Sequence, residues 1–122
     1  MRQIKFRGKR IENDEWVYGA LLTSDWNIDG YAVCAIVRSF AYDYNVSTFH
    51  VHPETVGQYT GLKDKNGVKI FEGDIYHQGD TNIKYAVEFH EGAFVGRQLN
   101  NKSKAGLAYW RDRIEVIGNI HQ

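Results

Sequence analysis

The sequence has one cysteine, one proline and no net charge over its 122 residues. The single cysteine, Cys34, cannot form a disulfide within the chain, and its apolar neighbours predict a buried small hydrophobe rather than a reactive thiol. Basic and acidic residues number fifteen each, so the overall positive field of many nucleic-acid binders is missing, although a local basic patch is compatible with this balance. No apolar run is long enough to span a membrane, and the N-terminus lacks the apolar core of a signal peptide. We therefore expect a soluble, cytoplasmic protein.

The residues that are abundant favour strands and turns. Aromatic residues make up 14% of the chain and glycine contributes twelve residues, while hydrophobic residues at 43% are enough for a packed core. A chain of this length buries roughly two-thirds of its unfolded surface, so it needs no disulfide or metal for stability. Short alternating runs separated by glycine-containing turns predict an all-β protein, a small barrel or sandwich of short antiparallel strands.

The most informative stretch is residues 56–74, VGQYTGLKDKNGVKIFEGD. The Asn66-Gly67 pair predicts a hairpin with a type I′ turn, since both central positions of that turn need a positive φ. Gly73 interrupts the apolar pattern of the second arm, which predicts a kink or bulge there. The short strands that follow suggest an SH3-like arrangement in the C-terminal half.

The same stretch resembles the signature of the YopX family, whose members are small proteins carried by prophages and bacteriophages. The resemblance extends to four further segments, namely residues 4–9 (IKFRGK), 15–19 (EWVYG), 87–94 (VEFHEGAF) and 115–120 (EVIGNI). It implies a phage-encoded, all-β protein of a bacterial host cell, from a family without an established biochemical activity, and it brings no catalytic residues. The expected organisation is one YopX-like domain over residues 1–122. Two sub-barrels, about 1–55 and 56–122, stay open as the alternative.

Polar residues of the central stretch are the best candidates for a binding surface. They are Gln58, Thr60, Lys63, Asp64, Glu72 and Asp74. Glu72 and Asp74 flank Gly73 with the spacing of an imaginable acid–base pair, but sequence alone shows neither a raised pKa nor a substrate. Their position at a strand kink favours a structural role, in which the carboxylates accept backbone N–H bonds.

Two histidines have the spacing of a metal site. On one strand, His50 and His52 would point to the same face about 6.5–7 Å apart, which suits two ligands of one metal. Pro53 and Glu54 follow too closely for the HxH pattern of cupins. A solvated or hydrogen-bonded histidine pair is therefore the favoured interpretation, and no metal or other cofactor is expected.

The N-terminal segment carries a basic stripe of Lys5, Arg7 and Lys9 and contains no acidic residue. Such a strand could follow the phosphates of a nucleic acid while Trp16 or Tyr18 stacks on its bases. The alternative is the polar face of an edge strand, where lysine and arginine prevent unwanted pairing with other chains. The zero net charge favours the edge-strand interpretation.

A group of aromatic residues allows a protein contact as well as a core. It consists of Trp26, Phe40, Tyr42, Tyr44 and Phe49. Tyrosine and tryptophan are enriched at the energetic centres of interfaces, although such clusters are more often core.

No nucleophile motif, phosphate-binding loop or dinucleotide fingerprint is present. The leading hypothesis is a non-enzymatic accessory protein that binds another macromolecule, a host or phage protein, and forms a homo-oligomer. A nucleic-acid-binding SH3-like module and a metal-dependent enzyme at His50 and His52 stay as alternatives.

Overall fold

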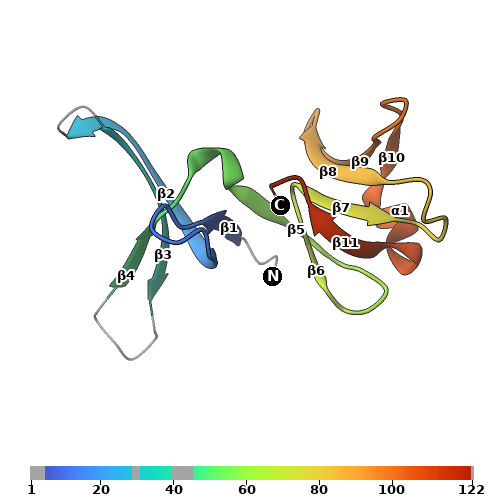
Figure 1. The fold of residues 1–122 in the computed structure, drawn as a ribbon, viewed down its shortest axis with the longest axis horizontal. Coiled ribbons are helices and arrows are strands. Elements are labelled where there is room, and N and C mark those ends of the chain that lie inside the picture. The colour runs from blue at the N-terminus through green and yellow to red at the C-terminus, as the bar shows by residue number, and fades with distance from the viewer. Residues whose placement is uncertain (1–4, 29–30, 40–45, 122) are drawn as a thin grey trace. The chain divides into compact units, whose positions relative to one another are not determined.

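The computed structural model describes residues 5–28, 31–39 and 46–121, and it describes side chains for 5–23, 34–38 and 47–121 (Figure 1). The described residues form eleven strands, one four-residue α-helix and two single-turn 3-10 helices, so the predicted all-β class is confirmed. Trp26, Phe40, Tyr42 and Tyr44 lie outside the described side chains, and the predicted aromatic contact involving them therefore stays a prediction.

The chain divides into two compact units, the first ending at Gln58 and the second beginning at Tyr59. The first unit contains β1 (Phe6–Lys9), β2 (Trp16–Ile28), β3 (Tyr31–Ser39), β4 (Val46–His50) and η1 (Pro53–Thr55). The strand β5 (Gly57–Lys63) passes from one unit into the other. The second unit continues with β6 (Lys69–Phe71), β7 (Asp74–His77), β8 (Tyr85–His90), β9 (Ala93–Gln98), β10 (Lys104–Gly106), α1 (Leu107–Trp110), η2 (Arg111–Arg113) and β11 (Glu115–Asn119). The division lies close to the 55/56 boundary of the two-part alternative, and the number of domains stays a prediction.

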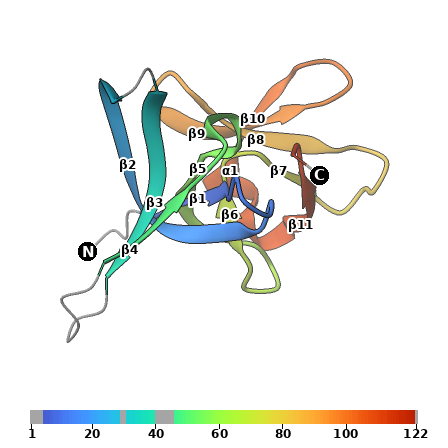
Figure 2. The same cartoon turned by 60° about the vertical axis from the view of Figure 1, so that its left-hand side comes forward.

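The first unit is an antiparallel sheet in the order β4-β3-β2-β1, with the first residues of β5 paired to β1. β2 and β3 run side by side as a long hairpin (Figure 2). One face of the sheet carries the core, in which Val17, Ile36 and Val51 are buried and five further apolar side chains pack against them. Alternation places Lys5, Arg7 and Lys9 on the opposite face, because successive side chains of a strand point to opposite sides.

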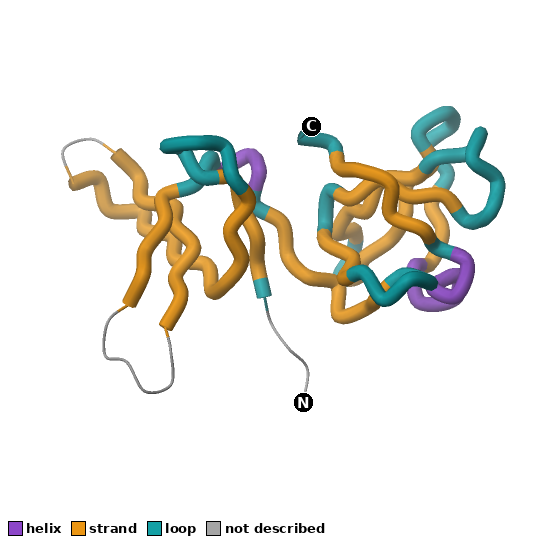
Figure 3. The backbone as a smooth tube through the Cα atoms, turned by 60° about the horizontal axis from the view of Figure 1, so that its bottom comes forward, coloured by secondary structure: helices purple, strands orange, loops and turns teal. Residues whose placement is uncertain are grey.

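The second unit combines the β5–β6 hairpin with a five-stranded antiparallel sheet in the order β10-β9-β8-β7-β11. Its core consists of Ile70, Tyr76, Val87, Leu107 and Ile114, each at most 3% exposed. The helical elements α1 and η2 follow one another directly, and Figure 3 shows them as the purple connection between β10 and β11.

The sheets do not close into a barrel. Among the described residues, β4, β10 and β11 each lie at the end of a hydrogen-bonded order. A helical segment joins β10 to β11, and these two strands pair with β9 and β7 rather than with each other. The barrel form of the expectation is therefore wrong, whereas the SH3-like arrangement of the C-terminal half stays a prediction.

The predicted central hairpin is confirmed, but its predicted type I′ turn is wrong. Gly67 has φ 82°, while Asn66 is not among the described residues with positive φ. The Gly67 N–H donates to the carbonyl of Asp64 (3.0 Å), and the Asp64 N–H donates to the carbonyl of Val68 (2.8 Å). This is the three-residue hairpin loop, in which a turn is followed by one left-handed glycine.

The predicted kink at Gly73 is a corner between two sheets. β6 ends at Phe71 and pairs with β5, whereas β7 begins at Asp74 and pairs with β8 and β11. The Gly73 N–H donates to the carbonyl of Val87 (2.9 Å), and the Gly73 carbonyl accepts from Ile120 (2.9 Å). The corner is thus fixed by backbone bonds to β8 and to the C-terminal segment.

Candidate functional site

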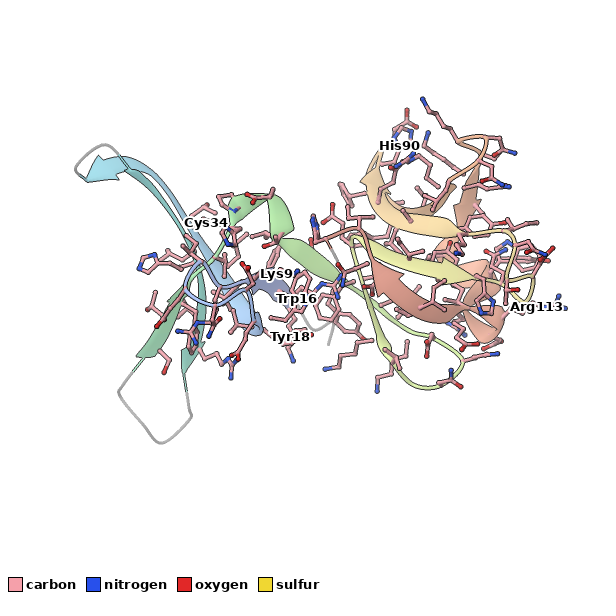
Figure 4. All side chains as sticks on the ribbon, in the orientation of Figure 1. Lys9, Trp16, Tyr18, Cys34, His90 and Arg113 are labelled. Atoms are coloured by element: carbon pink, nitrogen blue, oxygen red, sulfur yellow. The ribbon has the colours of Figure 1, made fainter. Side chains whose placement is uncertain are left out.

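Three cations and two aromatic rings share one face of the first unit. The register pairs Arg7 with Tyr18 and Lys9 with Trp16, and directly opposed residues lie on the same side of a sheet. The Arg7 Cζ lies 4.5 Å from the centroid of the Trp16 ring, and the Lys9 Nζ lies 5.5 Å from it. The Lys5 Nζ lies 6.0 Å from the centroid of the Tyr18 ring. We call these five residues the basic-aromatic face; Lys9, Trp16 and Tyr18 are labelled in Figure 4.

The residues of the basic-aromatic face differ in their exposure to solvent, and we therefore give them different roles on this surface. Tyr18 is 39% exposed and is the most accessible ring of the face, whereas Arg7 is only 6% exposed. Lys5, Lys9 and Trp16 are half-buried. Arg7 therefore orders the Trp16 ring, because a guanidinium stacked on an aromatic ring restricts both groups. Tyr18, Lys5 and Lys9 present the accessible part.

The interpretation of this stripe as an edge strand is wrong. β1 is hydrogen-bonded on both sides, to β2 over its whole length and to β5 through the pairs Phe6–Gln58 and Arg7–Gly57. An interior strand has no free ladder that its lysines would need to protect. The apolar pattern of residues 4–9 gave no signal for this, because the pairing with β5 joins segments fifty residues apart. The basic residues thus need another explanation.

Three of the six candidate residues of the central stretch are buried and bonded to backbone groups. The Thr60 hydroxyl donates to the carbonyl of Ile70 (2.8 Å) and accepts from the N–H of Leu62 (3.2 Å). The Asp74 Oδ2 accepts from the N–H of Phe71 (2.8 Å), which confirms the structural role predicted for this carboxylate.

The third, Asp64, is 6% exposed and accepts three backbone N–H bonds. Its Oδ1 accepts from Asn66 (2.8 Å) and Val68 (2.9 Å), which fixes the hairpin loop. Its Oδ2 accepts from the N–H of Val116 (3.0 Å), which ties the loop to β11. Lys63 is exposed, Gln58 and Glu72 are half-buried, and a binding role for all six stays a prediction.

The geometric premise of the histidine metal site is wrong. β4 ends at His50, and His52 lies beyond it at the start of η1. The His52 Nε2 lies 2.9 Å from Asp14 Oδ1, and its Nδ1 lies 3.8 Å from Glu54 Oε1. Within the described residues, no group of three histidine, cysteine or acidic side chains is placed to hold a metal ion. His52 therefore joins the β1–β2 turn to η1.

A shallow hollow of about 250 Å³ lies at the end of β4 in the first unit. Its lining residues are Arg10, Ile11, Glu12, Thr48, Phe49 and His50. Two guanidinium groups lie over the Phe49 ring, Arg10 at 4.9 Å and Arg38 at 5.2 Å from its centroid. The Arg10 Nη2 lies 2.7 Å from Glu12 Oε2. Sequence analysis identified Phe49 only as part of an aromatic cluster and did not reveal its arginine neighbours.

The second unit contains a polar cluster that sequence reasoning missed. The Lys65 Nζ and the His77 Nε2 lie 3.2 Å and 3.4 Å from Glu115 Oε2. The N–H of Gly79 donates to the His77 Nδ1 (3.1 Å), so the proton of the neutral ring is on Nε2 and faces Glu115. Both ring nitrogens of His77 therefore have a polar neighbour, and the cluster joins β7, β11 and the hairpin loop.

Two titratable groups outside these clusters are held in their neutral forms. Burial raises the pKa of the Tyr76 hydroxyl, and the nearby Tyr85 raises it further. Partial burial, reinforced by the charge of Glu54, raises the pKa of the Cys34 thiol. A raised pKa disfavours the thiolate, so this agrees with the prediction of an unreactive cysteine, although Cys34 is half-buried rather than fully buried.

Fold and face together define a small all-β protein of two units with a cationic, aromatic sheet surface on the first. The chain belongs to the YopX family, because the family model described as YopX protein matches residues 5–122. This confirms the resemblance seen in residues 56–74.

The crystal structure of protein EF1440 from Enterococcus faecalis has a similar fold. Its TM-score is 0.57 at 22% sequence identity, and the alignment covers 99% of this chain and 95% of that chain. At this identity the likeness shows the fold alone. No curated protein matches the chain. None of the helices in the described residues has the length and apolar character needed to cross a membrane.

Proposed function

We propose that this chain is a phage-type accessory protein that acts in the cytoplasm of a bacterial host by binding another macromolecule, without catalysis. Membership of the YopX family supports the phage-type role. The observation that carries the binding role is the basic-aromatic face, on which the exposed Tyr18 lies beside Lys5 and opposite Arg7. Tyrosine, tryptophan and arginine are the residues that contribute most to binding at macromolecular interfaces.

The engagement of the acidic candidates further supports a non-catalytic role. Asp64 and Asp74 accept hydrogen bonds from backbone N–H groups. His77 accepts one at Nδ1, and its Nε2 lies 3.4 Å from Glu115 Oε2. A general acid or base must exchange its proton with a substrate, whereas these groups hold the second unit together.

Affinity capture from a bacterial lysate tests the proposal. The tagged full chain is compared with the Lys9→Gln/Tyr18→Ala variant, with and without nuclease, and retained material is identified by mass spectrometry and gel analysis. The wild type retains a macromolecule that the variant loses. Tyr109→Ala is the matched control, because Tyr109 is an 83% exposed tyrosine in the second unit, and its capture stays at the wild-type level. Equal capture by wild type and double variant would contradict the proposal.

We propose in addition that the protein forms a homo-oligomer. β4 is the last strand in the sheet order of the first unit, and an edge strand offers unpaired backbone groups to a second copy. Thr48, which is exposed on β4, is the position to alter, because a lysine on an edge strand opposes pairing. Sedimentation equilibrium gives a multiple of 14.1 kDa for the wild type and a smaller mass for Thr48→Lys. A monomeric wild type at all concentrations would refute this proposal.

A further inference from the structure

We infer that the macromolecule bound by the basic-aromatic face is a single-stranded nucleic acid. This inference rests on the proposed function and specifies its partner. It follows from the arrangement of cations and rings in two adjacent rows, from the charge of the face and from the exposure of Tyr18.

Cations and rings lie on neighbouring strands at the same repeat. Arg7 and Lys9 lie two residues apart on β1, a step of about 6.5–7 Å, and Lys5 precedes the strand by one residue with its Nζ near the Tyr18 ring. Tyr18 and Trp16 repeat at the same step on β2, opposite Arg7 and Lys9. Adjacent strands lie about 4.8 Å apart. The face therefore offers a row of positive charge beside a row of aromatic rings.

This pairing of rows matches the chemistry of one nucleic-acid strand. Its backbone carries one negative charge for each nucleotide, and each nucleotide also has a planar base beside the backbone. A strand laid along β1 and β2 places its phosphates on the lysine side and its bases on the ring side. Tyr18 is the main stacking platform because it is the most exposed ring, and Lys5 and Lys9 contact phosphate.

The charge of the face favours a polyanion over a protein surface of mixed charge. The side chains that β1 and β2 place on this side, in the part whose side chains are described, are Lys5, Arg7, Lys9, Trp16, Tyr18, Ala20 and Leu22. None of them is acidic, although the chain as a whole has as many acidic as basic residues. All charged side chains among these are therefore positive, and a neutral chain can still hold a local phosphate-binding surface.

The aromatic rings of the face favour a single-stranded nucleic acid over a duplex. Bases in a duplex stack on one another, so their faces are not available to a protein side chain. In a single strand each base can stack on an aromatic ring, and this contact tolerates any sequence. We therefore expect binding without strong sequence preference and with little affinity for a duplex.

Fluorescence anisotropy of a labelled oligothymidylate of about 12 nucleotides tests the inference with the full-length protein. Anisotropy rises on titration at low salt, and the affinity falls with salt. Two phosphate contacts predict a slope of log K against log salt of about −1.4, and Lys9→Gln reduces its magnitude by about 0.7. Tyr18→Ala weakens binding roughly 5- to 150-fold, the loss expected for one base–ring stack.

Matched variants separate stacking and charge from general effects. Tyr18→Phe keeps the ring and retains affinity, whereas Tyr109→Ala and Lys104→Gln alter an exposed tyrosine and an exposed lysine of the second unit and leave binding unchanged. Circular dichroism confirms that each variant is folded. A duplex of the same length binds at least tenfold more weakly than the single strand, in line with the loss of a stack.

Each contrary result has a defined meaning. Absence of oligonucleotide binding at low salt overturns the inference, as does equal affinity for the duplex or an unchanged affinity of Tyr18→Ala. If the lysate capture then retains a nuclease-resistant protein that depends on Tyr18, the proposed function stands and its partner is a protein. If capture also shows nothing that depends on Tyr18, both the inference and the proposed function fail.

Discussion

Tyr76 is the residue around which the core of the second unit is built. It is fully buried, its ring stacks on Tyr85 with centroids 5.2 Å apart, and its hydroxyl has no hydrogen-bond partner among the described residues. The hydroxyl lies against the backbone of Gly96, where a Cβ would overlap it. An unsatisfied buried hydroxyl costs about 1–3 kcal/mol, so the fit of Tyr76 against Gly96 is obtained at the expense of stability.

Tyr76→Phe and Gly96→Ala should have opposite effects on the free energy of unfolding. Tyr76→Phe removes the unsatisfied hydroxyl and keeps the ring, so stability is unchanged or higher. Gly96→Ala forces atoms together and lowers stability by about 1–3 kcal/mol. The double variant recovers part of this loss, since the two positions are in contact. Urea denaturation measures all three, and a large loss for Tyr76→Phe would show that the hydroxyl has a partner.

The dependence of stability on alkaline pH tests the burial of Tyr76 in a second way. The folded state holds the Tyr76 pKa above that of an unfolded tyrosine, so the unfolded state releases this proton first as pH rises. Stability from this group is therefore complete below pH about 10 and is lost above it. The loss of stability above that pH is smaller in Tyr76→Phe than in the wild type.

At the scale of elements, the central hairpin is the part that the sequence predicted best. The pairing of its arms, the glycine in its loop and the break at Gly73 all followed from local residue types. The turn type did not, because Asp64 accepts the N–H groups of both Asn66 and Val68 and thereby selects a longer loop than a type I′ turn. The sequence does not show that the Asp64 carboxylate accepts these two N–H bonds, because they depend on the folded conformation of the loop.

The loop makes a direct prediction about two neighbouring residues. Gly67→Ala puts a Cβ at φ 82° and lowers stability by about 1–2 kcal/mol. Asn66→Ala changes stability by less than about 0.5 kcal/mol, because an exposed position without positive φ has no such requirement. Thermal unfolding of the two variants gives the comparison. Equal losses would indicate a type I′ turn after all.

Other elements show why local patterns were insufficient. Residues 23–28 are mostly polar, as is typical of a loop, yet β2 extends to Ile28 because its pairing with β3 continues past a shift in register. The basic stripe was favoured as an edge strand, yet the return of the chain at β5 places a strand on its other side. The pairing of β1 with β5 joins segments that are far apart in the sequence, and the alternation of single residues carries no information on such pairing.

At the scale of the whole molecule, the two units differ in how they use their polar side chains. In the second unit, buried or half-buried polar groups such as Asp64, Asp74 and His77 serve mainly to fix turns and corners. In the first unit, the cations of β1 lie against aromatic rings on the face opposite the core. The binding that we propose therefore belongs to the first unit, and the YopX family membership of residues 5–122 extends over both.

The most direct test of this assignment is lysate capture by Tyr18→Ala compared with Tyr109→Ala. Each variant removes one exposed tyrosine, Tyr18 from the basic-aromatic face and Tyr109 from the second unit. If the basic-aromatic face binds the partner, Tyr109→Ala retains it at the wild-type level and Tyr18→Ala loses most of it. Retention by Tyr18→Ala together with loss in Tyr109→Ala would contradict binding by this face and would place the binding surface on the second unit.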